Sequence, residues 1–296
     1  MNNFSTRQRG IALMLFSMFL LASMDGAGKH LTHTYSIFQV MWVRFLFLLP
    51  LVSLLALRKG VYRPWRSQQP RLQIIRSLIL LFEIAFFILS FKYLPLADVH
   101  AIASASPLLA TALAVPLLKE KVDFRRWAAV LIGLVGVLVI IQPGLSSFSY
   151  LSLIPLLSAA LWGLYQVLVK AVSTTDNVET GLFYTASIGV IALSFIAPFS
   201  WVTPDIEGWF FLTLVALLGC GGHFFMMKAF ELAPASALQP FNYTLVVWAT
   251  IIGAIGFGDL PGHWTIIGAG IVVAGGLYAF RREHIDDRRL QKSSVS

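Results

Sequence analysis

Three ionisable residues lie inside apolar stretches, where a charge is costly. Asp25 occurs in "SMDGAGKH", Arg44 in "VMWVRFLFLL" and Glu83 in "LILLFEIAFFIL". A charged side chain inside a bilayer is expensive, and it is retained where it pairs with another charge, contacts a ligand or takes up a proton. We therefore interpret these three residues as candidates for coupling or gating.

The positions of these residues along their apolar stretches limit the roles that each can have. If the apolar stretches are helices, Arg44 and Glu83 lie about 12 and 15 Å from the same end of two consecutive spans. They then form either a structural ion pair or a contact used in gating or substrate binding.

Asp25 precedes Lys29 by four residues, so both lie on one helical face. There Asp25 either binds a proton or a cationic group, or forms a solvated charge pair. Arg76, near the cytoplasmic end of its span, can snorkel, and we interpret it as a structural residue.

Two sets of aromatic and amide residues have the helical spacing i, i+3 and i+4: Trp162, Tyr165 and Gln166, and then Gln239, Asn242 and Tyr243. Each set forms one stripe on a helix. Such stripes either bind a planar molecule, by ring stacking and hydrogen bonds from the amides, or simply pack in a helix bundle. The amides favour binding, because facing lipid would penalise them.

Two histidines are further candidates for substrate binding. His223 follows the glycine-rich run "GCGG", which predicts either a helix break or very close helix packing. His223 contacts a substrate or a proton, or serves as a hydrogen-bonded packing residue. His100 and Gln239 occupy matching positions in a repeat described below. They line opposite mouths of one cavity, unless His100 is simply solvated.

The elements that position these residues are apolar stretches of about 20 residues, the length that spans a bilayer as a helix. The chain has 296 residues, of which 57% are hydrophobic and only 12% charged. This composition is typical of a membrane protein. We expect an all-α membrane protein with ten transmembrane helices, at about 10–28, 36–57, 72–93, 98–117, 126–142, 150–169, 178–199, 208–229, 235–257 and 264–280.

Charge and composition exclude several classes of function. With the N-terminus inside, 18 of the 22 Lys and Arg residues fall on the inner side. The net charge of +8 therefore sets the orientation, with both termini cytoplasmic, and does not indicate nucleic-acid binding. Cys220 is the only cysteine and is expected to be a packing residue. The sequence shows no phosphate loop, metal-ligand spacing or catalytic triad, so we expect no enzyme, metal or cofactor.

The chain repeats itself after 139 residues. "FKYLPLADVHAIASASPLLAT" at 91–111 matches "FELAPASALQPFNYTLVVWAT" at 230–250, and Glu120 falls on Asp259 without a gap. Lys29 matches Lys170 after 141 residues. Two homologous halves of five spans each must cross the membrane in opposite directions, because five is odd. Such inverted repeats are typical of secondary transporters, which bind substrate between the halves near mid-membrane.

The strings "LPLADVHAIASASPLL" and "EKVDFRRWAAVLIGLVGVLVI", with their echoes "ALQPFNYTLVVWATIIGAIGFGD" and "IIGAGIVVAGG", resemble the drug/metabolite transporter superfamily. Within it the chain is similar to ten-span EamA-domain permeases. Its opening "MFLLASMDGAGKHL" resembles a bacterial subgroup that includes riboflavin and S-adenosylmethionine transporters. The resemblance implies five plus five helices around a central cavity, at 10–142 and 150–280. A cytoplasmic tail follows at 281–296.

We therefore predict an inner-membrane carrier that works by alternating access. Its first candidate substrate is riboflavin or a similar planar heteroaromatic molecule, taken up from outside. Export of amino acids or drug-like amines, and uptake of S-adenosylmethionine, are the alternatives. A membrane-embedded enzyme or a scaffold is a remote one. Membrane lipid and the substrate are the expected partners. The sequence leaves open the driving force, the direction of transport and whether the protein is a homodimer.

Overall fold

The computed structural model describes residues 6–118, 124–142, 149–172, 175–232, 238 and 241–275, and within these ranges it contains helices but no strand. The helices follow in chain order: α1 (Thr6–Leu31), α2 (Ile37–Arg58), α3 (Pro70–Tyr93), α4 (Leu96–Ala103), α5 (Ser106–Leu118), α6 (Phe124–Ile141), η1 (Tyr150–Ser152), α7 (Leu153–Val172), α8 (Val178–Ser194), η2 (Ala197–Ser200), α9 (Ile206–Leu232), α11 (Thr244–Phe257) and a helix at His263–Gly275.

The described helices are apolar enough to lie in a membrane. Six candidate spans have the length and composition to cross one, and four shorter apolar helices accompany them: Val130–Ile141, Val178–Ser194, Thr244–Phe257 and His263–Gly275. Large apolar side chains also project outward. Phe82 is 58% exposed and Ile255 83% exposed. Apolar surface of this kind marks contact with lipid or a partner, so the chain is a multi-pass membrane protein.

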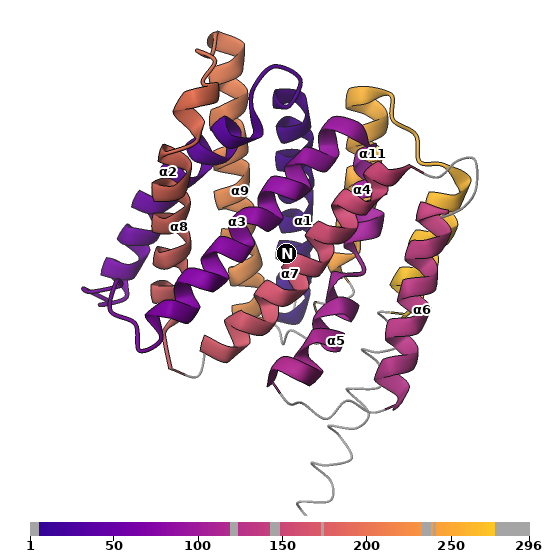
Figure 1. The fold of residues 1–296 in the computed structure, drawn as a ribbon, viewed down its shortest axis with the longest axis horizontal. Helices are drawn as coiled ribbons and strands as arrows, with labels where there is room; N and C mark the ends of the chain where they lie inside the picture. The colour runs from indigo at the N-terminus through magenta and orange to yellow at the C-terminus, as the bar shows by residue number, and fades with distance from the viewer. Residues whose placement is uncertain are drawn as a thin grey trace, which may run out of the picture.

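The helices pack in recurring pairs (Figure 1). The most extensive contacts join α1 to α9 and α3 to α7, and then α2 to α8. α7 also packs against α5, and α1 against α11. We call the end that holds the α2–α3 and α7–α8 connections the basic end. The end that holds the α1–α2 and α3–α4 connections is the opposite end.

The expected continuous helix at 98–117 is interrupted. α4 ends at Ala103 and α5 begins at Ser106. Because Pro107 has no amide hydrogen, it cannot donate to the carbonyl of residue 103. The hydroxyl of Ser106 donates to that carbonyl oxygen instead. The span is therefore built from two half-helices, and the break lies beside the cavity described below.

The glycine run does not break its helix, because α9 continues through residues 219–222. The alternative expectation, close packing, is confirmed. A Cβ at Gly222 would lie 2.6 Å from Cδ2 of Leu21 in α1. Glycines also join α6 to the helix at 263–275, where a Cβ at Gly268 would lie 2.5 Å from the Gly136 oxygen. Small residues thus let helix backbones approach closely.

Several expectations fall on residues outside the described part of the chain. Gln239, Glu120 and the tail at 281–296 belong to this group. Their roles stay predictions.

Candidate functional site

A cavity of about 1590 Å³ runs into the bundle between these helices. At the basic end its lining includes Arg58 of α2, Lys170 of α7 and Val178 of α8. Toward the opposite end the deepest lining residues include Phe87 and His100. The volume exceeds the roughly 300–1,000 Å³ of ordinary ligand pockets. It suits a chamber that communicates with one end of the molecule.

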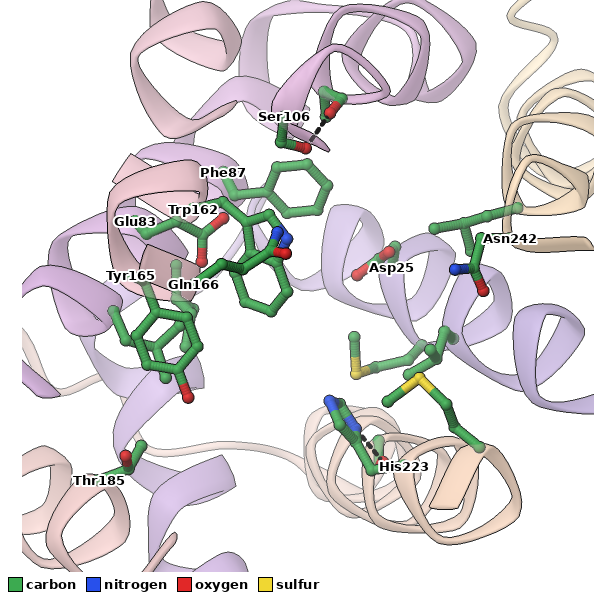
Figure 2. A pocket seen from close by; sticks show the side chains of 18 of the residues that line it. Asp25, Glu83, Phe87, Ser106, Trp162, Tyr165, Gln166, Thr185, His223 and Asn242 are labelled. Carbon is green, nitrogen blue, oxygen red and sulfur yellow. Dashed lines mark hydrogen bonds between the residues drawn. The ribbon is translucent and has the colours of Figure 1, made fainter. Parts of the chain in front are cut away.

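One wall of the cavity is formed by α3 and α7 (Figure 2). It carries Glu83, Trp162, Tyr165 and Gln166. The carboxylate of buried Glu83 accepts a hydrogen bond of 2.9 Å from the Ser158 hydroxyl. The rings of Trp162 and Tyr165 lie 5.4 Å apart between centroids. The structure thus brings the α7 stripe predicted from the sequence onto the cavity surface, beside a carboxylate.

The facing wall comes from α1, α9 and the residues just before α11, and it carries Asp25, His223 and Asn242. Tyr243, the residue directly before α11, also lines the cavity. The Nδ1 atom of His223 lies 2.8 Å from the Gly219 carbonyl oxygen, one helical turn earlier. This contact fixes the ring while its other nitrogen remains available to the cavity. The wall from α3 and α7 and the wall from α1 and α9 therefore both present hydrogen-bonding groups to the cavity.

His100 is buried and not solvated at a mouth, as one reading of the sequence allowed. Its side chain is 3% exposed, and its Nε2 lies 3.3 Å from Oδ2 of Asp25. Phe87 covers it, with 5.4 Å between ring centroids. The partner of Asp25 is thus a residue of α4, and not Lys29, which shares its helical face. Sequence reasoning missed Phe87, because a phenylalanine in an apolar run carries no distinguishing signal.

Arg44 and Glu83 both line the cavity, but they do not form the direct ion pair that their depth suggested. Within the described residues, the four ion pairs involve other side chains. Helical rise fixes how deep each residue lies, whereas pairing also needs the two side chains to point at each other around their helix axes. The Arg44 side chain lies against Gly219 of α9.

The opposite end holds a cluster of contacts around Lys29. Its ammonium group pairs with the Asp259 carboxylate, donates 3.2 Å to the Leu94 carbonyl oxygen and lies 5.0 Å from the Phe257 ring centroid. α11 ends at Phe257, and the positive φ of 68° at the following Gly258 turns the chain so that Asp259 meets Lys29. This end of the bundle joins α1, α3 and α11.

Arg76 does not snorkel to the surface as the sequence suggested. It is 4% exposed and donates hydrogen bonds of 2.6 Å to the Gly181 carbonyl oxygen and 3.3 Å each to the hydroxyls of Thr185 and Tyr165. Because Thr185 and Tyr165 line the cavity, Arg76 supports the site from behind. Arg76 stays inside the bundle because α8 supplies two acceptors there, the Gly181 carbonyl oxygen and the Thr185 hydroxyl.

Two hydrogen bonds repeat each other across the molecule. Ser17 of α1 donates to the Gly222 carbonyl oxygen of α9 at 2.7 Å. Ser158 of α7 donates to the Glu83 carbonyl oxygen of α3 at 3.4 Å. Ser158 follows Ser17 by 141 residues and Gly222 follows Glu83 by 139, the offsets of the sequence repeat.

In the part of the chain that the structure describes, no three His, Cys, Asp or Glu side chains are placed to hold a metal ion.

Comparison with known proteins finds a matching family model and similar proteins that are named as transporters. A model described as the EamA-like transporter family matches residues 8–142 and again residues 149–281. The chain is 26% identical over 284 residues to an S-adenosylmethionine uptake transporter of Rickettsia prowazekii, covering 94% of both chains. It is 28% identical over 235 residues to a riboflavin transporter of Vibrio cholerae, covering 76% of this chain and 75% of that one.

A solved crystal structure has a similar fold. Its TM-score is 0.61 at 20% identity, and the match covers 94% of this chain and 97% of that one. At this identity the likeness concerns the fold alone.

Proposed function

The chain belongs to the EamA-like transporter family, and we propose that it is a ten-span secondary carrier of a planar heteroaromatic metabolite. Its relatives are named as transporters, not as enzymes. The observation that carries the proposal is the cavity, which holds Asp25, Arg44 and Glu83 inside a bundle with an apolar exterior. Charges are kept at such depth where a pathway or a ligand needs them.

The carrier consists of two inverted repeats, at 10–142 and 150–280, followed by a tail at 281–296. The double match to the family model supports this division. So do the paired contacts, because α1 packs on α9 as α7 packs on α3. The matched serine hydrogen bonds support the same axis. Oppositely directed halves of this kind bind substrate at their interface.

The basic end faces the cytoplasm of a bacterium, with both termini inside and the protein in the inner membrane. The supporting observation is the excess of Lys and Arg in the connections and tails assigned to that side. The conformation described is then open to the cytoplasm and closed outside by the Lys29–Asp259 pair. Transport requires this pair to open while the basic end closes.

The two walls suit a flat molecule with hydrogen-bonding edges. Trp162 and Tyr165 offer ring faces, and Gln166 and Asn242 offer amides from the two sides. Gln239, Tyr243, His100 and His223 complete the proposed contacts. Riboflavin is the first candidate, because its ring system is planar and lined with donors and acceptors. The candidate direction is uptake.

S-adenosylmethionine is the second candidate. It also has a flat ring system, but in addition it carries a carboxylate, an ammonium group and a sulfonium group. The carboxylates of Asp25 and Glu83 on the cavity surface favour it, since they can attract its ammonium and sulfonium groups, which uncharged riboflavin lacks. Asp25, Glu83 and His223 are also the proposed proton-coupling groups, because each lies in the cavity.

Counterflow in liposomes tests this function. Purified protein is reconstituted with unlabelled riboflavin or unlabelled S-adenosylmethionine inside, and the entry of the labelled compound is followed. The proposal expects saturable entry of at least one compound that depends on the internal substrate. Entry no faster than in protein-free liposomes for both compounds would refute it.

A further inference from the structure

Arg44 lines the cavity, and in the described part of the chain no carboxylate lies within ion-pair distance of its guanidinium group. It lies on α2 and lines the cavity, and a Cβ on Gly219 would lie 3.8 Å from its Nε. It is within electrostatic range of Glu83, His223 and Cys220. None of these reaches it as an ion-pair or hydrogen-bond partner.

The two carboxylates of the cavity have other groups as their nearest contacts. Asp25 has His100 at 3.3 Å, and Glu83 accepts from Ser158 at 2.9 Å. Arg76, which is buried in the bundle, makes three hydrogen bonds. Arg44 therefore differs from Arg76 in that it lines the cavity without a hydrogen-bond or ion-pair partner among the described residues.

A guanidinium group remains protonated under all ordinary conditions and presents its N–H donors in a flat fork. That fork matches the paired oxygens of a carboxylate or a phosphate. Leaving such a charge unpaired at membrane depth is costly. We propose that Arg44 is the receptor for an oxyanion of the transported molecule, while the heteroaromatic ring lies across Trp162 on the facing part of the cavity.

This inference rests on the proposed function and sharpens it. It names the substrate class as heteroaromatic metabolites that bear a carboxylate or a phosphate, and it ranks S-adenosylmethionine above riboflavin. The carboxylates of Glu83 and Asp25 then lie near the cationic groups of such a molecule. A zwitterion would balance the charges of the cavity better than a neutral ring does.

Two pairs of probes test the proposal, because the members of each pair differ only in the oxyanion. S-adenosylmethionine is compared with its decarboxylated form, and flavin mononucleotide with riboflavin. Binding to the purified full-length protein is measured by calorimetry. We expect the oxyanion member of at least one pair to bind about tenfold or more tightly than its partner. The pair that responds distinguishes carboxylate from phosphate.

Arg44→Gln should abolish that preference, whereas Arg44→Lys should keep part of it. Because Arg44 lacks a partner, Arg44→Gln should leave the melting temperature of the ligand-free protein unchanged or raised. Arg76→Gln is the matched control and should lower it. Equal binding within both pairs, or a preference that survives Arg44→Gln, would overturn the inference while leaving the transport proposal standing. Absence of binding by all four probes would overturn both.

Discussion

The ring of Trp162 is the residue-scale feature that the transport proposal uses most directly. Trp162→Ala should weaken binding of a flat substrate by about tenfold or more, since both stacking and buried ring area are lost. Trp162→Phe should retain most of the affinity. Trp127 is the control, because it is exposed on α6 and does not line the cavity. Equal effects of Trp162→Ala and Trp127→Ala on titrated affinity would contradict the assignment.

Individual side chains also show what spacing alone can predict. The period of a helix places Trp162, Tyr165 and Gln166 on one face, and all three line the cavity. Their role in binding stays a prediction. Pairing is harder to derive, because it depends on the rotation of helices about their axes. The contact between Asp25 and His100 joins residues far apart in the chain, so no local sequence pattern predicts it.

Among the elements, α6 and the helix at 263–275 depend on close glycine contact. Gly268→Ala should destabilise the protein by about 1–3 kcal/mol, because the new methyl group meets the backbone of residue 136. Gly270→Ala is the matched control, since a Cβ there meets nothing within 4 Å. Thermal unfolding in detergent measures both. An equal loss of stability in both variants would show that helix propensity, and not packing, determines the effect of the substitution.

Asp176 ties together the connections at the basic end. Partial burial raises its pKa, but hydrogen bonds from Gln73, Ser67 and the Gln68 amide outweigh this, so its pKa lies below the ordinary value. A carboxylate with a depressed folded pKa stabilises above its unfolded pKa and loses that stabilisation as pH falls through the folded one.

Asp176→Asn should therefore lower the melting temperature at pH 7. The difference from the wild type should shrink as the pH falls below about 4, the usual range for an aspartate. Melting curves measured across this range provide the check. A difference that stays constant with pH would mean that the charge of Asp176 contributes nothing.

Where a helix is interrupted or continues is only partly predictable from sequence patterns. Apolar length predicts the span that contains α4 and α5, but its interruption depends on Pro107 and on a serine hydroxyl that replaces the missing amide. The run of glycines in α9 allows either a break or close packing. Only the position of Leu21 on α1 decides for packing, and that position is a property of the assembled bundle.

At the scale of the whole molecule, the helices associate across the two sequence repeats. α1 packs on α9 and α3 packs on α7, so the units that move in transport are expected to combine helices from both halves. The repeat itself was visible as matched strings. Which helices pair was not, because the contacts follow from how the two halves interlock.

The Lys29–Asp259 pair should control access from outside. Asp259→Asn removes its negative charge, so an impermeant thiol reagent added to intact cells should label Cys220 several-fold faster than in the wild type. Asp205→Asn is the control, because Asp205 lies at the same end but partners Tyr35. Labelling that is equally slow in all three proteins would exclude a gating role for the pair.

The central claim is that this cavity is the transport pathway, and the single cysteine offers a direct test. Cys220 lines the cavity. Counterflow is measured before and after stoichiometric reaction with a bulky maleimide, with Cys220→Ser as the unreactive control. We predict that modification abolishes substrate entry, that bound substrate slows the reaction, and that Cys220→Ser is unaffected. Undiminished counterflow by fully modified protein would contradict the account.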